Sequence, residues 1–276
     1  MLPGEVAPAM AGESVNPYDT PDANPLIERS GPVSLPPGPY GAYRDNRILS
    51  RWVVGLLLFY AALQAFWLVV NLLYSFSVAA TSSETLDTIV LGVERISWTV
   101  LATFVVFGVW IVRSGKNAWL FHQLKRHAAN HGGRRYHEVI STTPGWCVGW
   151  YFIPIANFWK PFVAMREIFR ASTTGQAAPG YLLPFWWTLW LLSSMGDQLT
   201  SRPQTGPASH WNDHLITIVW TSSSGINVAL SVIAIQLVRT LTRMQIDSAH
   251  HFSDMDAEVL KRPSPGDRLT GTFLDR

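Results

Sequence analysis

The sequence is poor in cysteine and in charge. Cys147 is the only cysteine among 276 residues, which excludes an intrachain disulfide, a cysteine-based zinc cluster and a redox pair within the chain. Only 14% of the residues are charged, and the net charge is +2. No run of Lys and Arg with interleaved aromatic residues stands apart from the apolar blocks, so we expect no nucleic-acid partner.

The apolar residues come in long blocks, and the charged residues lie mostly between them. A lipid bilayer imposes this distribution because it penalises buried charge. The chain also holds 13 Trp and 8 Tyr, whose half-polar rings favour the membrane–water boundary. The composition therefore predicts an all-α integral membrane protein.

Two polar tails flank the predicted helical membrane domain, residues 44–247. Residues 1–43 hold nine prolines and little apolar patterning, which predicts a disordered, Pro-rich N-terminal tail. The basic start and short apolar stretch of a secretory signal peptide are both missing from it. Residues 248–276 are interpreted as a polar C-terminal tail.

Four blocks are predicted to be transmembrane helices, at about residues 52–76, 88–112, 180–195 and 215–238. A fifth apolar block, 145–165, is poorly suited to crossing because Pro154 and Pro161 each remove a backbone donor. We interpret residues 145–172 as a non-spanning, Pro-broken element, re-entrant or lying at the interface. Amphipathic cytoplasmic-face helices are expected after the second span, ending at Gly132 and Gly133, and at about 161–172.

The positions of Lys and Arg favour this count. With four spans, fourteen of the basic residues near the membrane fall on one side and only Arg95 and Arg202 on the other. Because basic residues accumulate on the cytoplasmic side, we expect both termini to be cytoplasmic. Five spans would instead place Arg239 and Arg243 outside.

The central segment "PGWCVGWYFIPIANFWKPFVAMREIFRAS", Pro144 to Ser172, resembles a bacterial membrane-protein family called domain of unknown function 4328. The resemblance extends to "WIVRSGKN", "WWTLWLLS" and "LVRTLTRMQ" and covers about residues 50–247. Tyr151 and Phe169 stand where the family has Trp, and Lys160 where Arg is common. The resemblance implies a multi-pass protein of a bacterial inner membrane and no assigned reaction.

No Asp, Glu, Lys, Arg or His occupies the middle of any predicted span, so we expect no catalytic, cofactor-binding or metal-binding residues there. The span residues Gln64, Asn71, Asn227 and Ser231 are explained by hydrogen bonds between helices. His210 and His214 have the spacing of metal ligands, as do His127 and His131, but incidental histidines explain them better.

The remaining candidate is a cluster at the cytoplasmic face. Its members are Arg113, Asn117, Trp146, Trp150, Pro154, Asn157, Pro161, Arg166, Glu167 and Arg170. Under one interpretation, Asn157, Asn117 and Arg113 brace a broken helix. Under the other, the cluster is a basic, Trp-lined pocket for an anionic lipid headgroup or small anion.

The sequence favours a non-enzymatic scaffold or partner-binding component, with the central element as its interaction surface. The alternative is a small-solute or lipid-handling permease. Expected partners are membrane lipids, anionic ones included, and a second protein or a second copy of the chain.

Overall fold

The structure, a computed structural model, describes residue 33 and residues 35–76, 83–131, 139–174, 180–200 and 209–261. Over these residues the fold is helical, and the only β-type pairing is an isolated bridge between Gly38 and Gly41. The helices are α1 (Arg47–Phe76), α2 (Ser83–His131), α3 (Trp146–Gly149), α4 (Lys160–Ala171), α5 (Leu182–Thr200) and α6 (Ser209–Lys261). Two short 3-10 turns, η1 (Trp150–Phe152) and η2 (Ala156–Phe158), connect α3 to α4.

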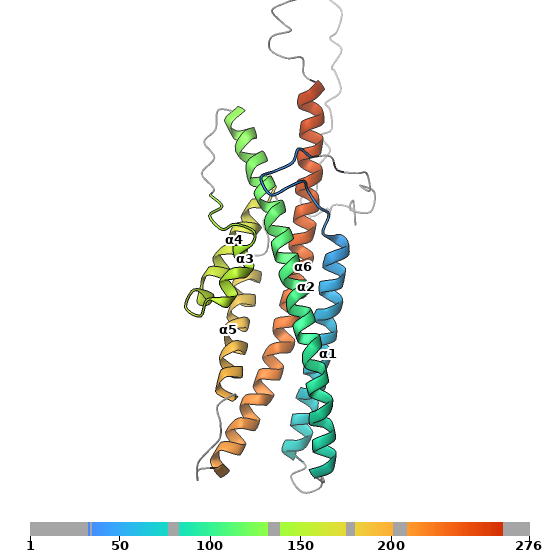
Figure 1. Ribbon diagram of the computed structural model, residues 1–276, viewed down its shortest axis with the longest axis vertical. Coiled ribbons are helices and arrows are strands. Elements are labelled where there is room, and N and C mark those ends of the chain that lie inside the picture. Colours follow the sequence, from blue (N-terminus) through green and yellow to red (C-terminus); the bar gives the residue numbers. More distant parts are fainter. Residues whose placement is uncertain are drawn as a thin grey trace, which may run out of the picture. The chain divides into compact units, whose positions relative to one another are not determined.

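Three of the described helices are long and apolar enough to cross a membrane. The qualifying segments are Arg47–Leu72 of α1, Val100–Ala129 of α2 and Thr221–Met255 of α6. The predicted span at 180–195 forms most of α5, which is not among the three. The four helices run in alternating directions (Figure 1).

Large apolar side chains cover the outer faces of the long helices. They include Trp52, Phe59, Phe66 and Leu72 of α1 and Leu101, Phe104 and Val109 of α2. Water-soluble proteins seldom expose so much contiguous apolar surface, whereas lipid tails solvate it at little cost. This distribution is expected of a membrane protein.

The helices differ from the prediction mainly at their ends. α2 continues without interruption from the second predicted span to His131, which agrees with the amphipathic continuation expected there. α6 runs to Lys261, so the first part of the predicted C-terminal tail is helical. Ala249 and Phe252 explain this difference, because both are buried against Phe121 of α2. Residues 262–276 lie outside the described part of the chain.

The predicted N-terminal tail also ends earlier than expected. Tyr40 packs edge-on against Trp119, with ring centroids 5.4 Å apart, and Tyr43 lies 5.9 Å from Phe121. Gly38 lies so close to α2 that an added Cβ would be 3.1 Å from Leu120. Residues 35–43 are therefore a strap packed on α2, whereas residues 1–32 and 34 lie outside the described part.

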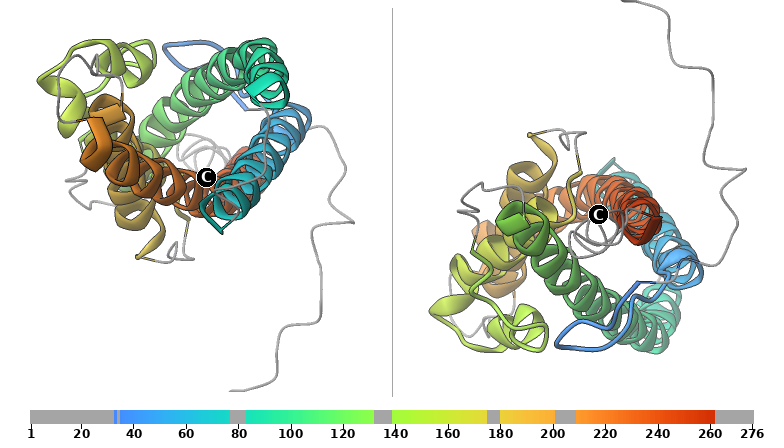
Figure 2. Two further views of the ribbon diagram at one scale, coloured as in Figure 1. Left: turned by 90° about the horizontal axis from the view of Figure 1, so that it is seen from below. Right: turned by 90° about the horizontal axis from the view of Figure 1, so that it is seen from above.

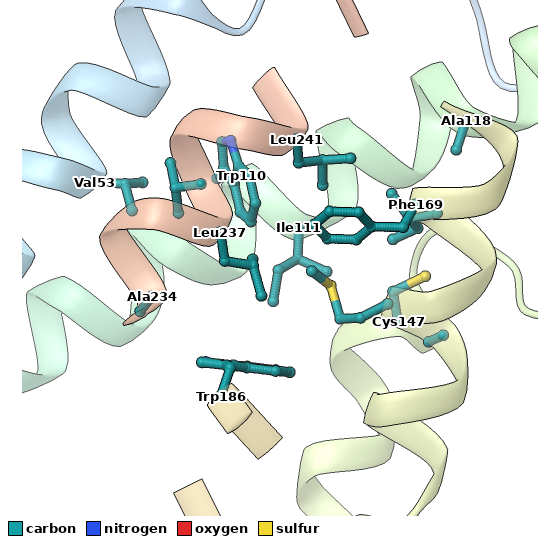
Figure 3. Close-up of a cluster of buried hydrophobic side chains, with 14 of the residues drawn as sticks. Val53, Trp110, Ile111, Ala118, Cys147, Phe169, Trp186, Ala234, Leu237 and Leu241 are labelled. Carbon is teal, nitrogen blue, oxygen red and sulfur yellow. The ribbon is translucent and has the colours of Figure 1, made fainter. Parts of the chain in front are cut away.

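The main core takes side chains from all six α-helices. Trp110, Met165, Leu237 and Leu241 are almost wholly buried there, and Figure 3 shows Trp110, Leu237 and Leu241 facing one another. α1 and α5 each pack against α6, and Figure 2 shows them on different sides of it. The core thus fixes the Pro-broken element to the long helices.

Candidate functional site

The segment from Pro144 to Gly149 packs along α2 and runs toward the N-terminal end of that helix. A Cβ on Gly115 would lie 3.4 Å from the Cα of Pro144, and one on Gly108 would lie 3.7 Å from Val148. Gly115 and Gly108 are two helical turns apart, which is roughly 10 Å along the axis. Two glycines on one face of α2 therefore provide the surface along which α3 packs.

The segment turns where the prolines interrupt the helix. Pro154 lies in the turn between η1 and η2, and Pro161 lies in the first turn of α4. At that position the missing N–H of proline costs no helical hydrogen bond. The backbone N–H of Asn157 donates to the Ile153 carbonyl at 2.8 Å, and the Trp187 indole donates to the Phe158 carbonyl at 3.2 Å. The helix predicted at about 161–172 is thus confirmed to within a residue.

Both ends of the element lie beside the same stretch of α2. The indole N–H of Trp119 donates to the Thr142 carbonyl, at 2.9 Å, before the turn. After the turn, the Lys125 ammonium donates to the carbonyls of Arg170, at 3.1 Å, and Thr173. A cation is favourable at these carbonyls because they form the negative end of α4. Both ends of residues 142–173 are therefore fixed to α2, at points roughly 9 Å apart along its axis.

Glu167 ties the two arms of the element together. Its carboxylate accepts from the backbone N–H groups of Ser141, at 3.2 Å, and Thr142, at 3.0 Å. It also accepts from the Ser141 hydroxyl, at 2.6 Å. Hydrogen bonds to a carboxylate are stronger than those between neutral groups, so Glu167 serves as a structural clamp.

Large apolar side chains project from the turn. Phe152 is 81% exposed and Ile155 is 74% exposed, and Phe158 and Trp159 are also exposed. We call these four residues the apolar tip. Surface of this kind marks a contact with lipid or protein.

Aromatic and basic side chains stack behind the tip. The rings of Trp146 and Trp150 are 4.7 Å apart, and the ammonium of Lys160 lies 5.2 Å from the centre of the Trp150 ring. The Arg166 guanidinium lies 5.9 Å from the Phe162 ring. A cation over an aromatic face is attracted by the ring quadrupole, so these contacts fix two positively charged side chains of α4 against aromatic rings.

Cys147 lies inside the element and is buried. Its thiol donates to the Thr143 carbonyl at 3.4 Å. Burial, and then the negative charge of Glu167, raises the pKa of the Cys147 thiol to about 12. The thiol is therefore protonated near neutral pH and acts as a small packing residue.

Two members of the predicted cluster lie elsewhere. The Arg113 guanidinium donates to the Asp45 carbonyl at 2.8 Å. Asn117 donates to the Arg44 carbonyl at 2.9 Å and accepts from the Arg44 backbone N–H at 3.2 Å. The prediction that Arg113 and Asn117 brace the broken helix is thus corrected, because their hydrogen bonds hold the chain just before α1.

A buried polar cluster at the same level was missed by the sequence analysis. Gln245 of α6 is its centre: its amide nitrogen donates to the Ser114 carbonyl, at 2.9 Å, and to the Ser172 hydroxyl, at 3.3 Å. Its amide oxygen accepts from Asn46, at 3.1 Å, and Asn117, at 3.2 Å. We call this cluster the polar junction; its members are Asn46, Ser114, Asn117, Ser172, Gln245 and Ser248.

The polar junction joins α1, α2, α4 and α6. Asn46 also donates to the Ser114 hydroxyl at 3.1 Å, and Ser248 donates to the Ser172 carbonyl at 2.7 Å. A sequence signal did exist, since Gln245 and Ser248 interrupt the apolar stripe of α6 at helical spacing. The partners could not be found without the fold, because they lie in other helices.

Polar residues deeper in the helices pair across an interface, as expected of Asn227. Its side-chain oxygen accepts from the Ser193 hydroxyl of α5 at 2.7 Å, and Ser231 donates to its carbonyl at 2.8 Å. The side chains of His210 and His214 lie outside the described part of the chain. Among the described residues no group of three His, Cys, Asp or Glu is placed to hold a metal ion.

A family model described as "Domain of unknown function (DUF4328)" matches residues 71–243. The matched region includes residues 142–173, all of α2 and α5 and the larger part of α6, but only residues 71–76 of α1. No curated protein and no solved structure matches the chain.

Proposed function

The chain belongs to the family described as Domain of unknown function (DUF4328), and we propose that it is a non-enzymatic scaffold of a bacterial inner membrane. In this proposal α1, α2, α5 and α6 cross the bilayer and both termini are cytoplasmic. The apolar tip of the re-entrant element is the surface that binds a protein partner.

The arrangement of charge supports this orientation. The hydrogen bonds from Asn46 to Ser114 and Gln245 place the start of α1, the middle of α2 and the late part of α6 at one level. Basic residues flank this level in four parts of the chain: Arg44, Arg47 and Arg51 before and in α1, Arg113 and Lys116 in α2, Arg170 at the end of α4, and Arg239 and Arg243 in α6. Basic residues flanking spans favour the cytoplasmic side.

The scaffold proposal rests on one observation: hydrogen bonds fix the backbone of the element, while the side chains of the apolar tip stay exposed. Glu167 and Lys125 fix the two ends of the element, and Trp187 holds Phe158 from α5. The tip is nevertheless highly exposed at Phe152. Apolar surface on a rigid support loses little conformational entropy on binding.

Site-directed photocrosslinking of the full-length protein in native membranes tests this. A photoreactive amino acid at Phe152 is compared with the same group at Phe104, which is exposed on α2. We expect a discrete protein adduct from position 152 and only lipid adducts from position 104. The same partner should co-purify with the unmodified protein and be lost with Ile155→Ser. Lipid-only adducts at both positions would refute the scaffold role.

Introduced cysteines test the orientation, because Cys147 is buried and its thiol is protonated. We expect a cysteine at position 175 to be protected from a membrane-impermeant maleimide added outside, and one at position 205 to be labelled. Labelling of position 175 from outside would overturn the four-span topology.

A lipid-handling permease is the second candidate, favoured by a different observation. The Trp150 indole nitrogen, the Tyr151 hydroxyl and the Asn157 amide oxygen are buried and have no hydrogen-bond partner among the described residues. Polar atoms of this kind suit a bound polar molecule. Mass spectrometry of the purified protein should then detect a lipid or solute that is lost with Asn157→Ala.

A further inference from the structure

Three buried polar atoms next to the polar junction have no hydrogen-bond partner among the described residues. They are Oδ1 of Asn46, Nε1 of Trp110 and Oγ1 of Thr242. The three side chains are 1%, 0% and 6% exposed, respectively. Each comes from a different part of the fold: Asn46 immediately precedes α1, Trp110 lies in α2, and Thr242 lies in α6.

The hydrogen bonds of the polar junction bring these atoms together. The amide nitrogen of Asn46 donates to Ser114 of α2 and Gln245 of α6, so the oxygen of the same planar amide also lies between these helices. Trp110 comes four residues before Ser114, and Thr242 comes three residues before Gln245. Residues at these spacings share one helix face, so both lie about one turn from the Asn46 amide.

The orientation of Trp110 agrees with this placement. Figure 3 shows its indole nitrogen on the edge of the ring away from Trp186, toward the part of α6 that carries Leu241. Thr242 follows Leu241 directly. The N–H group therefore points along α6 toward the polar junction.

The chemistry of the three atoms selects the ligand. An indole N–H only donates, an amide oxygen only accepts, and a hydroxyl does either. An indole N–H cannot ligate a metal cation, and none of the three groups is a carboxylate. An anion would be repelled by the partial negative charge of the amide oxygen. A small neutral molecule that both donates and accepts satisfies all three, and ordered water is the usual such partner of buried polar groups.

We propose that an internal water site lies between α1, α2 and α6, about one helical turn from the polar junction. The water accepts from Trp110 Nε1, donates to Asn46 Oδ1 and pairs with Thr242 Oγ1. It extends the polar junction by one helical turn. It also links the segments 110–117 and 237–245, two of those that carry the family resemblance.

The variant Thr242→Val tests the site by the sign of its effect, since it removes the hydroxyl and keeps the branched shape. If the hydroxyl bonds to a water, its loss lowers the Tm of the full chain in lipid nanodiscs by about 2–4 °C. If no water is bound, removing an unpaired hydroxyl raises the Tm. The control is Thr240→Val, a less buried threonine on the same helix. A Tm equal to that of the control, or above it, overturns the proposal.

Nuclear magnetic resonance supplies a second readout that does not depend on stability. In protein labelled with ¹⁵N-tryptophan, the Trp110 indole signal is the one absent from Trp110→Phe. We expect a cross-relaxation peak between this indole proton and water, and a shift of the signal in Thr242→Val but not in Thr240→Val. An indole signal with no water cross-peak would show a dry site and overturn the proposal.

Discussion

Gln245 offers the sharpest test of what holds the helices together at the polar junction. It is 1% exposed, and its amide makes four hydrogen bonds to residues before α1, in α2 and after α4. The informative change is Gln245→Met, which nearly keeps the side-chain volume and removes the polar atoms. Any loss of stability then reports the hydrogen bonds more than a cavity.

The expected size of the effect follows from the partners left behind. A buried hydrogen bond contributes about 0.5–1.5 kcal/mol net, so four of them contribute roughly 2–6 kcal/mol. Asn46 and Asn117 each keep another bond, to Ser114 and Arg44, whereas the Ser172 hydroxyl loses the hydrogen bond that it accepts from Gln245. We therefore expect a loss of about 3 kcal/mol, in the lower half of that range.

Thermal unfolding of the purified full-length protein in detergent measures this loss. For a chain of this size, 3 kcal/mol corresponds to a fall in Tm of about 6–12 °C. Gln236→Met is the matched control, because Gln236 is exposed on the same helix, and it should leave the Tm nearly unchanged. Equal Tm values for the two variants would refute the view that the polar junction stabilises the fold.

Three other results are expected. Gly115→Leu should lower the Tm by several degrees because α3 packs on Gly115, whereas Gly55→Leu should be neutral because nothing lies within 4 Å of a Cβ at that position; equal thermal stability would contradict this packing. Glu167→Gln should speed limited proteolysis between residues 132 and 145, since the charged acceptor for Ser141 and Thr142 is lost; an unchanged cleavage rate would count against the clamp. Cys147 should resist maleimide at pH 8 and react only after denaturation or as the pH approaches its raised pKa of about 12, as followed by mass spectrometry; rapid labelling of the folded protein at pH 8 would contradict its burial.

Local sequence signals predicted the break in the central element and the start of α4. Pro154 and Pro161 remove backbone donors, and a proline in the first turn of a helix is compatible with a helix start, so the break and the beginning of α4 could both be expected. The periodicity of Phe162, Met165, Ile168 and Phe169 predicted its buried face, and three of these four are buried. Such features depend on neighbours in the chain, which the sequence shows directly.

The ends of the helices were harder to predict. Residues 248–261 contain His250, His251 and Asp254 and look like a solvated tail, yet Ala249 and Phe252 pack on Phe121. Residues 35–43 are rich in proline and glycine, yet Tyr40 and Tyr43 pack on α2. In both places a distant apolar partner offsets the entropy cost of ordering the chain.

The sequence by itself determined that the chain has membrane-length apolar helices and a central element that prolines interrupt, because both follow from composition and local backbone chemistry. The tertiary structure alone decided which polar residues act together. It assigned Arg113 and Asn117 to the start of α1, Glu167 to the two arms of the central element, and Gln245 to the centre of the polar junction. The physical reason is that the donors and acceptors of these bonds lie 25 to 199 residues apart in the sequence, and only the packed helices bring them together.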